Sequence, residues 1–426
     1  MDRSFVLFGD ICYTESCDRI ISCPASFLVV EKGKITGVFD RLPGEYRTLP
    51  LYDYGGRLVI PGLSDLHTHA SQYQFRGLWM DEELLDWLER HTFPEEARYS
   101  DADYALRAYS IFADDLLSSP TTRANIFATI HRDSALVLCQ LLEERGLAAN
   151  VGKVNMDRNC PPSLTEDPQA SLADTVSFIK TVRERFTRVH PIVTPRFIPS
   201  CSDNLCRLLG DLAVRMDVPV QSHLSENTGE LDWVSSLCPD SASYADAYRR
   251  LGLWGRVKTC MAHCVWSRDR EDELLENDNL YIAHCPDSNT NLSSGIFPAR
   301  YFLDRGVHVG LGTDIAGGTS LSLFRAMTDA VKVSKLYWRY VDDSVPKLDF
   351  AAAFYMASKG GGSFFGRVGS FEEGYDADIV VLDDSDSPTC IEGLTAAQRL
   401  ERYSSLCPEK PVCAKFVQGE KLQTGY

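Results

Sequence analysis

The stretch Leu58–Phe75, LVIPGLSDLHTHASQYQF, combines a strand pattern with two histidines separated by one residue. An apolar run, a Pro-Gly break and a second short apolar run lead to His67-Thr68-His69. Because side chains alternate along an extended strand, His67 and His69 are predicted to point to the same side. The apolar strand is expected to be buried, and buried imidazoles need polar partners. The pair therefore indicates two ligands of a metal ion.

Composition places the chain among ordinary globular proteins. It has 426 residues, 44% of them hydrophobic and 24% charged, which suits a barrel with an accessory domain. The net charge of -17 argues against binding a nucleic-acid backbone, which needs a basic surface. No apolar run approaches the roughly 18 residues of a membrane-spanning helix. The 14 cysteines form no C-x-x-C pair, so we expect reduced thiols and a cytoplasmic protein.

The middle of the chain alternates short apolar strands with longer amphipathic stretches such as 173–186 and 202–215. The expected strands are 58–66, 122–129, 148–154, 190–196, 218–223, 257–263, 280–284 and 307–314. Eight such strands predict an α/β protein with a (β/α)₈ TIM-type barrel. A doubly wound open sheet is the rival, but no G-x-G-x-x-G follows the first strand.

Both ends of the chain show hairpin patterns of short strands and tight turns. We expect 26–30 to pair with 35–39, and 379–382 and 412–417 to form strands near the other end. The prediction is one small composite β domain built from 1–57 and 366–426, with the hydrolase barrel spanning 58–365.

Polar residues are predicted to gather at one rim of the barrel. They follow the apolar strands at their ends, and they are His67, His69, Arg196, His223, His263, His284 and Asp314. The carboxyl ends of barrel strands form the active site in this architecture. Three imidazoles and one carboxylate suit a borderline ion such as Zn²⁺, with Fe²⁺ as the alternative.

Glu226 lies three residues beyond His223, in the sequence His-Leu-Ser-Glu. A carboxylate beside a metal ion can take a proton from water and pass it to a substrate. The alternative is a solvated acid on a loop. Next to the predicted metal site, the proton-transfer interpretation is favoured.

The chain resembles the amidohydrolase superfamily over nearly its whole length, and within it the guanine deaminase family. The resemblance rests on the following motifs: PGLSDLHTHASQYQF (61–75), FATIH (127–131), GKVNMDRNCP (152–161), VTPRF (193–197), HLSEN (223–227), AHC (262–264), AHCPDSN (283–289), GLGTDIAGG (310–318) and the C-terminal FEEGYDADIVVLD. Several are shared by metal-dependent aminohydrolases in general, whereas HASQY, TPRF and MDRNCP are similar to the guanine deaminase family in particular. Two departures, at 119–130 and after Cys264, remove no ligand.

The resemblance implies a role for each matching residue. It assigns the metal ligands His67, His69, His223 and Asp314, the proton shuttle Glu226, the imidazole His263 beside the reacting centre, and the purine-binding positions Gln72, Arg196 and Phe197. Asp314 would also help to deprotonate the water. His284 is placed on the substrate side of the site, with structural support as the alternative role.

The expected number of metal ions is one per chain. Relatives with two metals bridge them with a carboxylated lysine at the end of strand four, but here Arg196 occupies that end. Lys153, on the third strand, is a poorer candidate for such a bridge. The other zinc deaminase fold carries H-x-E and P-C-x-x-C, and this chain has neither.

The implied reaction is hydrolytic deamination of guanine to xanthine and ammonia. Guanine is then the partner molecule, with no nucleic acid and no membrane, and the resemblance implies a homodimer. Two alternatives stay open. The same mechanism could act on cytosine, an adenosine derivative or a triazine, or the chain could be a scaffold protein without enzymatic activity, which the intact ligand set disfavours.

Overall fold

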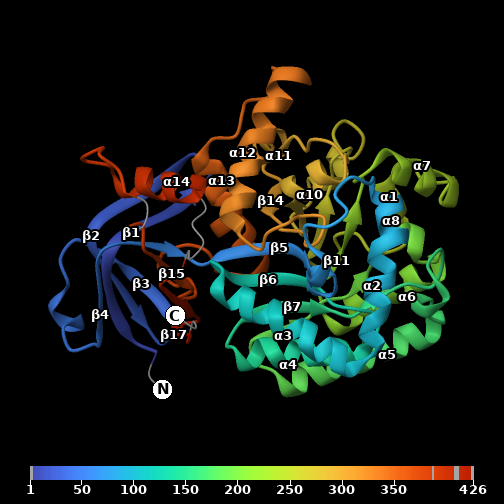
Figure 1. The fold of residues 1–426 in the computed structure, drawn as a ribbon, viewed down its shortest axis with the longest axis horizontal. Helices are drawn as coiled ribbons and strands as arrows, with labels where there is room; N and C mark the ends of the chain where they lie inside the picture. Colours follow the sequence, from blue (N-terminus) through green and yellow to red (C-terminus); the bar gives the residue numbers. More distant parts are fainter. Residues whose placement is uncertain (1–2, 386–387, 407–411, 424–426) are drawn as a thin grey trace.

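The computed structural model describes residues 3–385, 388–406 and 412–423, and its centre is an eight-stranded sheet with parallel neighbours (Figure 1). The strands, in spatial order, are β11 (Val220–Leu224), β12 (Thr259–His263), β13 (Leu280–His284), β14 (His308–Leu311), β5 (Leu63–His69), β6 (Thr121–Phe127), β7 (Ala148–Gly152) and β9 (Val189–Pro191). A parallel bridge between Val193 and Val220 joins the two edges and closes the sheet. The predicted (β/α)₈ barrel is confirmed.

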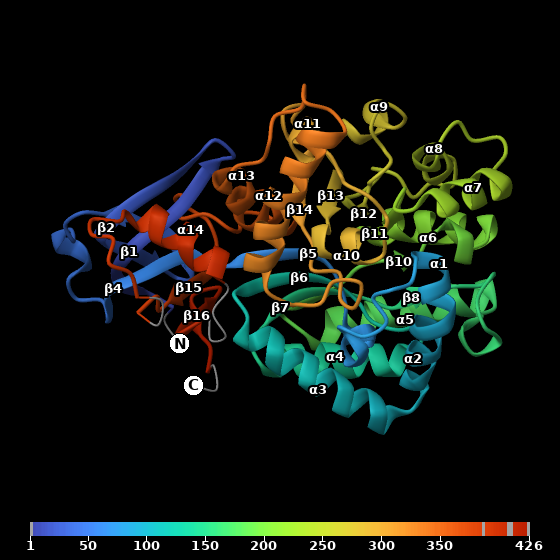
Figure 2. The same cartoon turned by 45° about the horizontal axis from the view of Figure 1, so that its top comes forward.

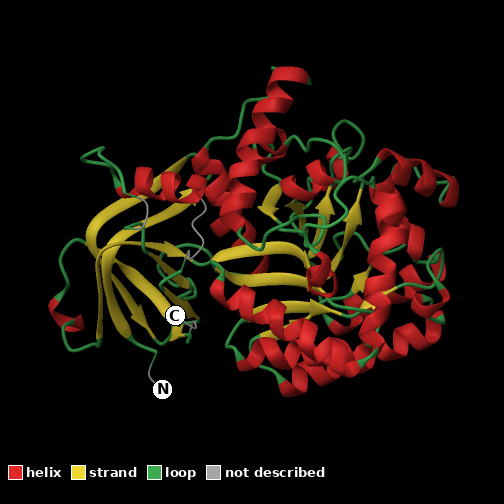
Figure 3. Cartoon of the chain, in the orientation of Figure 1, coloured by secondary structure: helices red, strands yellow, loops and turns green. Residues whose placement is uncertain are grey.

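Helices surround this barrel, as the colouring by secondary structure shows (Figure 3). The main ones are α3 (Ala102–Ser118), α4 (Arg132–Glu144), α5 (Pro168–Arg185), α6 (Asp203–Met216), α7 (Thr228–Leu237), α8 (Tyr244–Arg250) and α12 (Leu323–Tyr340). Shorter helices are α1 (Leu84–Trp87), α2 (Phe93–Ala97), α9 (Asp272–Leu275), α10 (Pro286–Asn291), α11 (Ala299–Leu303) and α13 (Phe350–Tyr355). Amphipathic helices such as α6 bury an apolar stripe, which in α6 includes Leu205, Leu209 and Leu212. The amphipathic stretches at 173–186 and 202–215 correspond to α5 and α6.

Both ends of the chain build a second sheet beside the barrel (Figure 2). Its spatial order is β17 (Glu420–Lys421), β16 (Ala414–Val417), β15 (Ile379–Leu382), β4 (Leu51–Pro61), β1 (Phe5–Ser16), β2 (Arg19–Glu31) and β3 (Lys34–Phe39). Helix α14 (Ala396–Leu406) contacts β1, β2 and β4 of this sheet. The expected hairpin of 26–30 with 35–39 is part of the antiparallel pair β2–β3.

The expected first strand, 58–66, is divided between the two sheets. Residues up to Pro61 pair with β15 in the small sheet, whereas the barrel strand begins at Leu63. Gly62 lies between them, and a Cβ on it would come within 2.1 Å of the Thr122 hydroxyl oxygen. The chain therefore passes from one sheet to the other through the Pro-Gly break, where only glycine fits.

The expected fourth strand, 190–196, is also interrupted. It consists of β9 and the two-residue β10 (Thr194–Pro195), which pairs with β8 (Val154–Asn155) in a separate short ladder. Pro191 and Pro195 lack the backbone N–H that a continuous ladder needs. Arg196 follows β10 directly. Within the described residues, no helix is both long and apolar enough to cross a membrane.

Candidate active site

The four predicted metal ligands meet at the carboxyl end of the barrel. His67 and His69 come from β5, and their Nε2 atoms lie 3.2 Å apart. His223, on β11, places its Nε2 3.3 Å from that of His69. Asp314 follows β14, and its Oδ1 lies 3.1 Å from His67 Nε2 and 3.4 Å from His69 Nε2. The prediction that His67 and His69 share one side of their strand is confirmed.

The protonation states of these side chains favour binding of a cation. Burial lowers the pKa of His67, lowers that of His69 to about 3, and lowers that of His223 well below the usual value. The His223 Nδ1–H donates to the Arg196 carbonyl at 2.6 Å, which leaves the Nε2 lone pair facing the other imidazoles. Neutral imidazoles whose Nε2 atoms converge fit a borderline divalent ion.

Asp314 completes the ligand set as an anion. Burial alone would raise its pKa, but His67 nearby and the hydrogen bonds from His67 and His69 hold that pKa well below the usual value. The Asp314 N–H donates to the His67 carbonyl at 2.8 Å, which ties the loop after β14 to β5. The chain therefore offers three imidazoles and one carboxylate, the donor set expected from the sequence.

Two further residues lie within ligand distance of this group. Nitrogens of His67, His223 and His263 lie within 4.8 Å of one another, and so do the ligand atoms of His263, Cys285 and Asp314. Burial raises the pKa of the Cys285 thiol well above its usual value, and the thiol donates to the Ala283 carbonyl at 3.4 Å. Cys285 is thus a neutral neighbour of the site, and the sequence did not single it out.

Glu226 and His263 face each other beside the ligands. Glu226 Oε2 lies 3.2 Å from His263 Nε2, and Glu226 Oε1 accepts a hydrogen bond from the Ser294 hydroxyl at 3.1 Å. His263 Nδ1 pairs with the side-chain oxygen of Asn289 at 2.9 Å, so Nε2 is the nitrogen left for the site. Burial, and then the charge of Asp314, raise the pKa of Glu226 well above its usual value. A raised pKa suits a carboxyl group that both accepts and releases a proton.

A second buried acid fixes the backbone at Glu226. Glu230 Oε2 accepts hydrogen bonds from the N–H groups of Glu226, at 2.9 Å, and Asn227. Asn227 caps α7, with Glu230 at the third helical position, so the two form a capping box. The Ser/Thr/Asn-x-x-Glu signal for this cap is present in the sequence as Asn-Thr-Gly-Glu.

Asp65 joins the first and eighth strands behind the ligands. Its Oδ1 accepts from the His67 and Thr313 N–H groups, both at 3.1 Å, and its Oδ2 accepts from the Thr313 hydroxyl at 2.5 Å. Because Thr313 precedes Asp314, this bridge holds a ligand from each strand in place. Burial raises the pKa of Asp65 to about 6, while the Thr313 hydrogen bonds oppose that rise.

Gln72 and Arg196, the expected purine-binding positions, converge on a third residue, Glu96. Gln72 Nε2 donates to Glu96 Oε1 at 2.9 Å, and Arg196 Nη1 donates to Glu96 Oε2 at 2.6 Å. All three side chains are buried. Glu96 lies on α2, in a segment without a chemical motif, so sequence reasoning gave no reason to choose it.

Phe197 forms part of an apolar cavity next to Arg196. The cavity has a volume of about 600 Å³ and is lined by Leu85, Leu88, Glu89, Phe93, Asn159, Cys160, Pro161, Phe197 and Trp233. The Phe197 ring centroid lies 6.4 Å from that of His223 and 6.4 Å from that of Trp233. Asn159, Cys160 and Pro161 belong to the MDRNCP motif. Phe197 therefore lies between this cavity and the histidine cluster.

His284 and Lys153 are both buried, but they differ in their partners. Among the described residues, neither ring nitrogen of His284 has a hydrogen bond, and its ring lies 5.2 Å from that of Phe297. Lys153 donates to the Val154 carbonyl at 3.1 Å and to Glu166 at 2.5 Å. Lys153 is thus committed to other partners, and one metal ion per chain stays a prediction.

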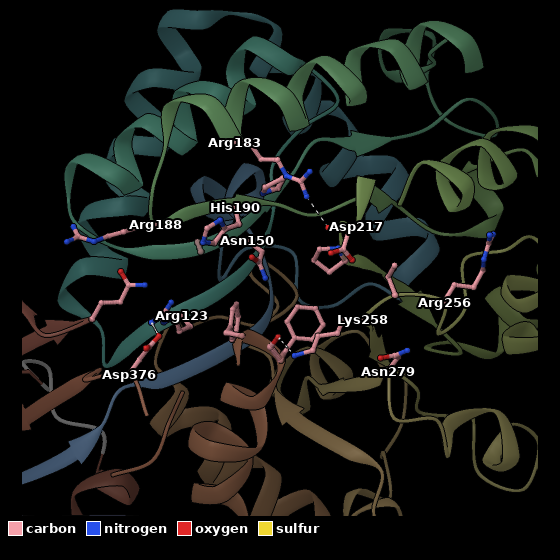
Figure 4. Close-up of a pocket in the computed structure, with 17 residues that line it drawn as sticks. Arg123, Asn150, Arg183, Arg188, His190, Asp217, Arg256, Lys258, Asn279 and Asp376 are labelled. Carbon is pink, nitrogen blue, oxygen red and sulfur yellow. Dashed lines mark hydrogen bonds and ion pairs between the residues drawn. The ribbon is translucent and has the colours of Figure 1, made fainter. Parts of the chain in front are cut away.

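A second cavity, of about 700 Å³, lies at the opposite end of the barrel, where the strands begin (Figure 4). It is rich in basic side chains, but most of them have partners already. Arg123 pairs with Asp376, Arg188 with Glu420 and Arg256 with Asp211. Lys258 donates to the Ser363 and Phe364 carbonyls. The end of the barrel with side chains available for catalysis is therefore the one that carries the histidines.

Comparisons with known proteins agree with this geometry. The model of the amidohydrolase family matches residues 58–420. The chain is 36% identical to a guanine deaminase of Dictyostelium discoideum, over 87% of this chain and 84% of that protein. It is 39% identical to a guanine deaminase of Homo sapiens, over 81% of this chain and 76% of that protein. A crystal structure of guanine deaminase from C. acetobutylicum with bound guanine in the active site superimposes with a TM-score of 0.95 and 43% identity, covering 98% of this chain and all of that one.

Proposed function

The chain belongs to the amidohydrolase family, and on that basis we propose that it hydrolyses guanine to xanthine and ammonia. One observation carries this proposal. The metal-binding histidines and Asp314 share a buried site with Arg196 and Gln72, two donors suited to the edge of a flat base. A hydrolytic centre beside such donors fits a nucleobase that carries an amino group.

The proposed metal ligands are His67, His69, His223 and Asp314, and the proposed ion is Zn²⁺, with Fe²⁺ as the alternative. The support is the donor chemistry, because three neutral imidazoles and one carboxylate are typical of such ions. A bound divalent ion would polarise water and supply a nucleophile at neutral pH. One ion per chain is expected, since Lys153 is engaged with Glu166.

Glu226 is the proposed proton carrier of the reaction. It takes a proton from the attacking water and delivers it to N3 of guanine while the water oxygen adds to C2. A second proton transfer then lets the amino group leave as ammonia. The raised pKa of Glu226 supports this role, because a carrier must both accept and release a proton near neutral pH. Asp314 would assist in deprotonating the water.

His263 is proposed to hold the reacting oxygen during this step. Its Nδ1 contact with Asn289 leaves Nε2 directed into the site, 3.2 Å from Glu226 and 3.7 Å from Asp314. A group at this position can form a hydrogen bond to the oxygen that adds to C2. The loss of ammonia would then occur within a fixed set of donors and acceptors.

Recognition of the base is proposed to depend on Arg196, Gln72 and Phe197. The Arg196 guanidinium would donate to O6, Gln72 would donate to another atom of the ring edge, and Phe197 would contact a face of the base. A planar cation with several N–H groups is suited to a carbonyl oxygen. His284 is retained as a candidate on the substrate side, although its ring packs against Phe297.

The remaining proposals concern the cellular compartment, the oligomeric state and the partners of the protein. We infer a reducing compartment such as the cytoplasm, which the thirteen described cysteines support because all of them are free thiols. The expected homodimer stays a prediction, and light scattering coupled to size-exclusion chromatography measures it. No nucleic-acid partner is proposed, given the net charge of -17.

The deciding experiment is an ultraviolet assay of purified protein with guanine, adenine, cytosine and a triazine supplied separately. We expect conversion of guanine to xanthine with release of ammonia, and loss of activity after treatment with a chelator. A preference for adenine, cytosine or the triazine would overturn the guanine assignment. Full activity in protein shown to be metal-free would overturn the metal-dependent mechanism.

A further inference from the structure

Glu96 is a buried acid that the proposed reaction does not use. It lies on α2, is 1% exposed and contacts neither the metal ligands nor Glu226 by any hydrogen bond within the described chain. Its two carboxylate oxygens are divided between Gln72, which follows β5, and Arg196, which follows β10. One carboxylate thus links the two hydrogen-bond donors that are proposed to bind the base.

The link determines how the Gln72 amide is oriented. Its Oε1 accepts a hydrogen bond from the Ala316 N–H at 3.0 Å, so the amide nitrogen must face Glu96, where it donates at 2.9 Å. An amide nitrogen has two N–H groups, and one of them is committed to Glu96. The acid therefore fixes the orientation of the Gln72 amide and leaves its second N–H free of Glu96.

The same carboxylate limits the movement of Arg196. The guanidinium donates through Nη1 at 2.6 Å and lies 5.3 Å from the centroid of the Phe93 ring, which is also on α2. An arginine presents five N–H groups in a planar fork, so one fixed contact orients the others. Helix α2 thus supplies both an anion and an aromatic ring to a single guanidinium.

A simpler explanation is that Glu96 only neutralises a buried positive charge. That role requires one contact, with Arg196. It does not account for the second oxygen, which is used by an uncharged amide whose other end is bound to Ala316. The shared use of both oxygens fixes the spacing between two donors that follow different strands, β5 and β10.

We propose that Glu96 is a positioning residue that sets Arg196 and Gln72 for the 6-oxo edge of the purine and so contributes to selection of 6-oxopurines. The inference rests on the proposed function. It assigns no proton transfer and no bond-breaking step to Glu96. Its effect reaches the substrate only through the two donors.

The test compares binding of two bases that cannot lose an amino group. Hypoxanthine has the 6-oxo group and purine lacks it, and both are measured as competitive inhibitors of guanine deamination. In Glu96→Gln protein we expect hypoxanthine to bind about 10–100-fold more weakly, the usual effect of disturbing a hydrogen bond that involves a charged group. Purine binding should change less than about threefold, because purine has no O6 atom for Arg196 to contact.

Glu95→Gln is the matched control on the same helix. Glu95 pairs with Arg98 at 2.9 Å and with the Tyr104 hydroxyl, and it makes no hydrogen bond to Gln72 or Arg196 in the described structure. Its inhibitor constants should equal those of the parent. Glu96→Asp serves as the second Glu96 variant, because it keeps the charge but its shorter side chain cannot hold both partners. It should show an intermediate loss for hypoxanthine.

Three outcomes separate the possibilities. Selective loss of hypoxanthine binding in either Glu96 variant, with normal metal content, supports the inference. Equal loss for both inhibitors, or no loss for either, in folded and metal-loaded variants would overturn it while leaving guanine deamination by the parent intact. A parent protein that does not deaminate guanine would instead refute the proposed function.

Discussion

Replacing Glu226 with glutamine should separate catalysis from stability. Glutamine has nearly the same shape, and its side-chain oxygen can still accept the hydrogen bond from Ser294 that Glu226 accepts at 3.1 Å. It cannot carry a proton between water and the ring. We therefore expect kcat to fall by about 10²–10⁴, the usual contribution of general acid-base catalysis. At 1.36 kcal/mol per tenfold change, this is about 2.7–5.4 kcal/mol of transition-state stabilisation.

The same substitution should not destabilise the fold. Burial and the nearby charge of Asp314 both disfavour the ionised form of Glu226 and raise its pKa. A neutral amide avoids these unfavourable terms, so the Tm of the variant should equal or exceed that of the parent. Loss of activity with retained stability is the pattern expected where function requires an unfavourable buried group.

The assay for Glu226→Gln combines three measurements on one preparation: guanine turnover by ultraviolet absorbance, metal content by elemental analysis, and thermal unfolding. Glu276→Gln, at an exposed position, is the control and should match the parent in all three. Turnover near the parent rate in metal-loaded Glu226→Gln protein would refute the assignment of the proton carrier. A large drop in Tm would refute the electrostatic reasoning.

Three other predictions follow from the structure. Arg196→Met should impair guanine turnover severely while metal content stays normal. It should also lower the free energy of unfolding by about 3–5 kcal/mol, because Glu96 loses its buried partner. A parent-like kcat/KM would contradict the first expectation, and parent-like stability would contradict the second. Elemental analysis should find one transition-metal ion per active chain, and two ions would contradict the single-metal site. Burial lowers the pKa of Lys415 to about 7, below the value of about 10.4 expected in the unfolded chain. The unfolded state then binds more protons between these values, so stability should rise with pH there, and Lys415→Met should flatten that rise in denaturant titrations followed from pH 7 to 10.

The expected effect of Arg196→Met illustrates what the sequence could not provide. From the sequence alone, Arg196 is a cation at a strand end, and its removal would be expected to leave the fold intact. The structure adds a buried acid one hundred positions earlier in the chain, 2.6 Å from the guanidinium. No periodicity or spacing connects Glu96 with Arg196, because their contact depends on how α2 folds over the barrel rim.

The three histidines proposed as ligands could be predicted because each obeys a local rule. His67 and His69 are two residues apart on an apolar strand, and His223 ends another. Their grouping then followed from the barrel, whose strand ends all meet at one rim. Asp65 obeys no such rule. Asp65 lies within an apolar strand and its role depends on Thr313, which is 248 positions away.

The backbone conformation at the barrel rim explains why strand patterns in the sequence do not predict side-chain directions next to the candidate active site. Ser225, His263 and Asp314 have φ values of 49°, 75° and 46°, in the left-handed region that residues other than glycine rarely adopt. Each such residue costs roughly 1–3 kcal/mol and persists only where its surroundings fix it. At Asp314 the fixing contact is the N–H bond to the His67 carbonyl. A positive φ turns a side chain away from the regular alternation of a strand. The side chains of His263 and Asp314 therefore reach the site by departing from strand geometry, although strand geometry is what made the site recognisable in the sequence.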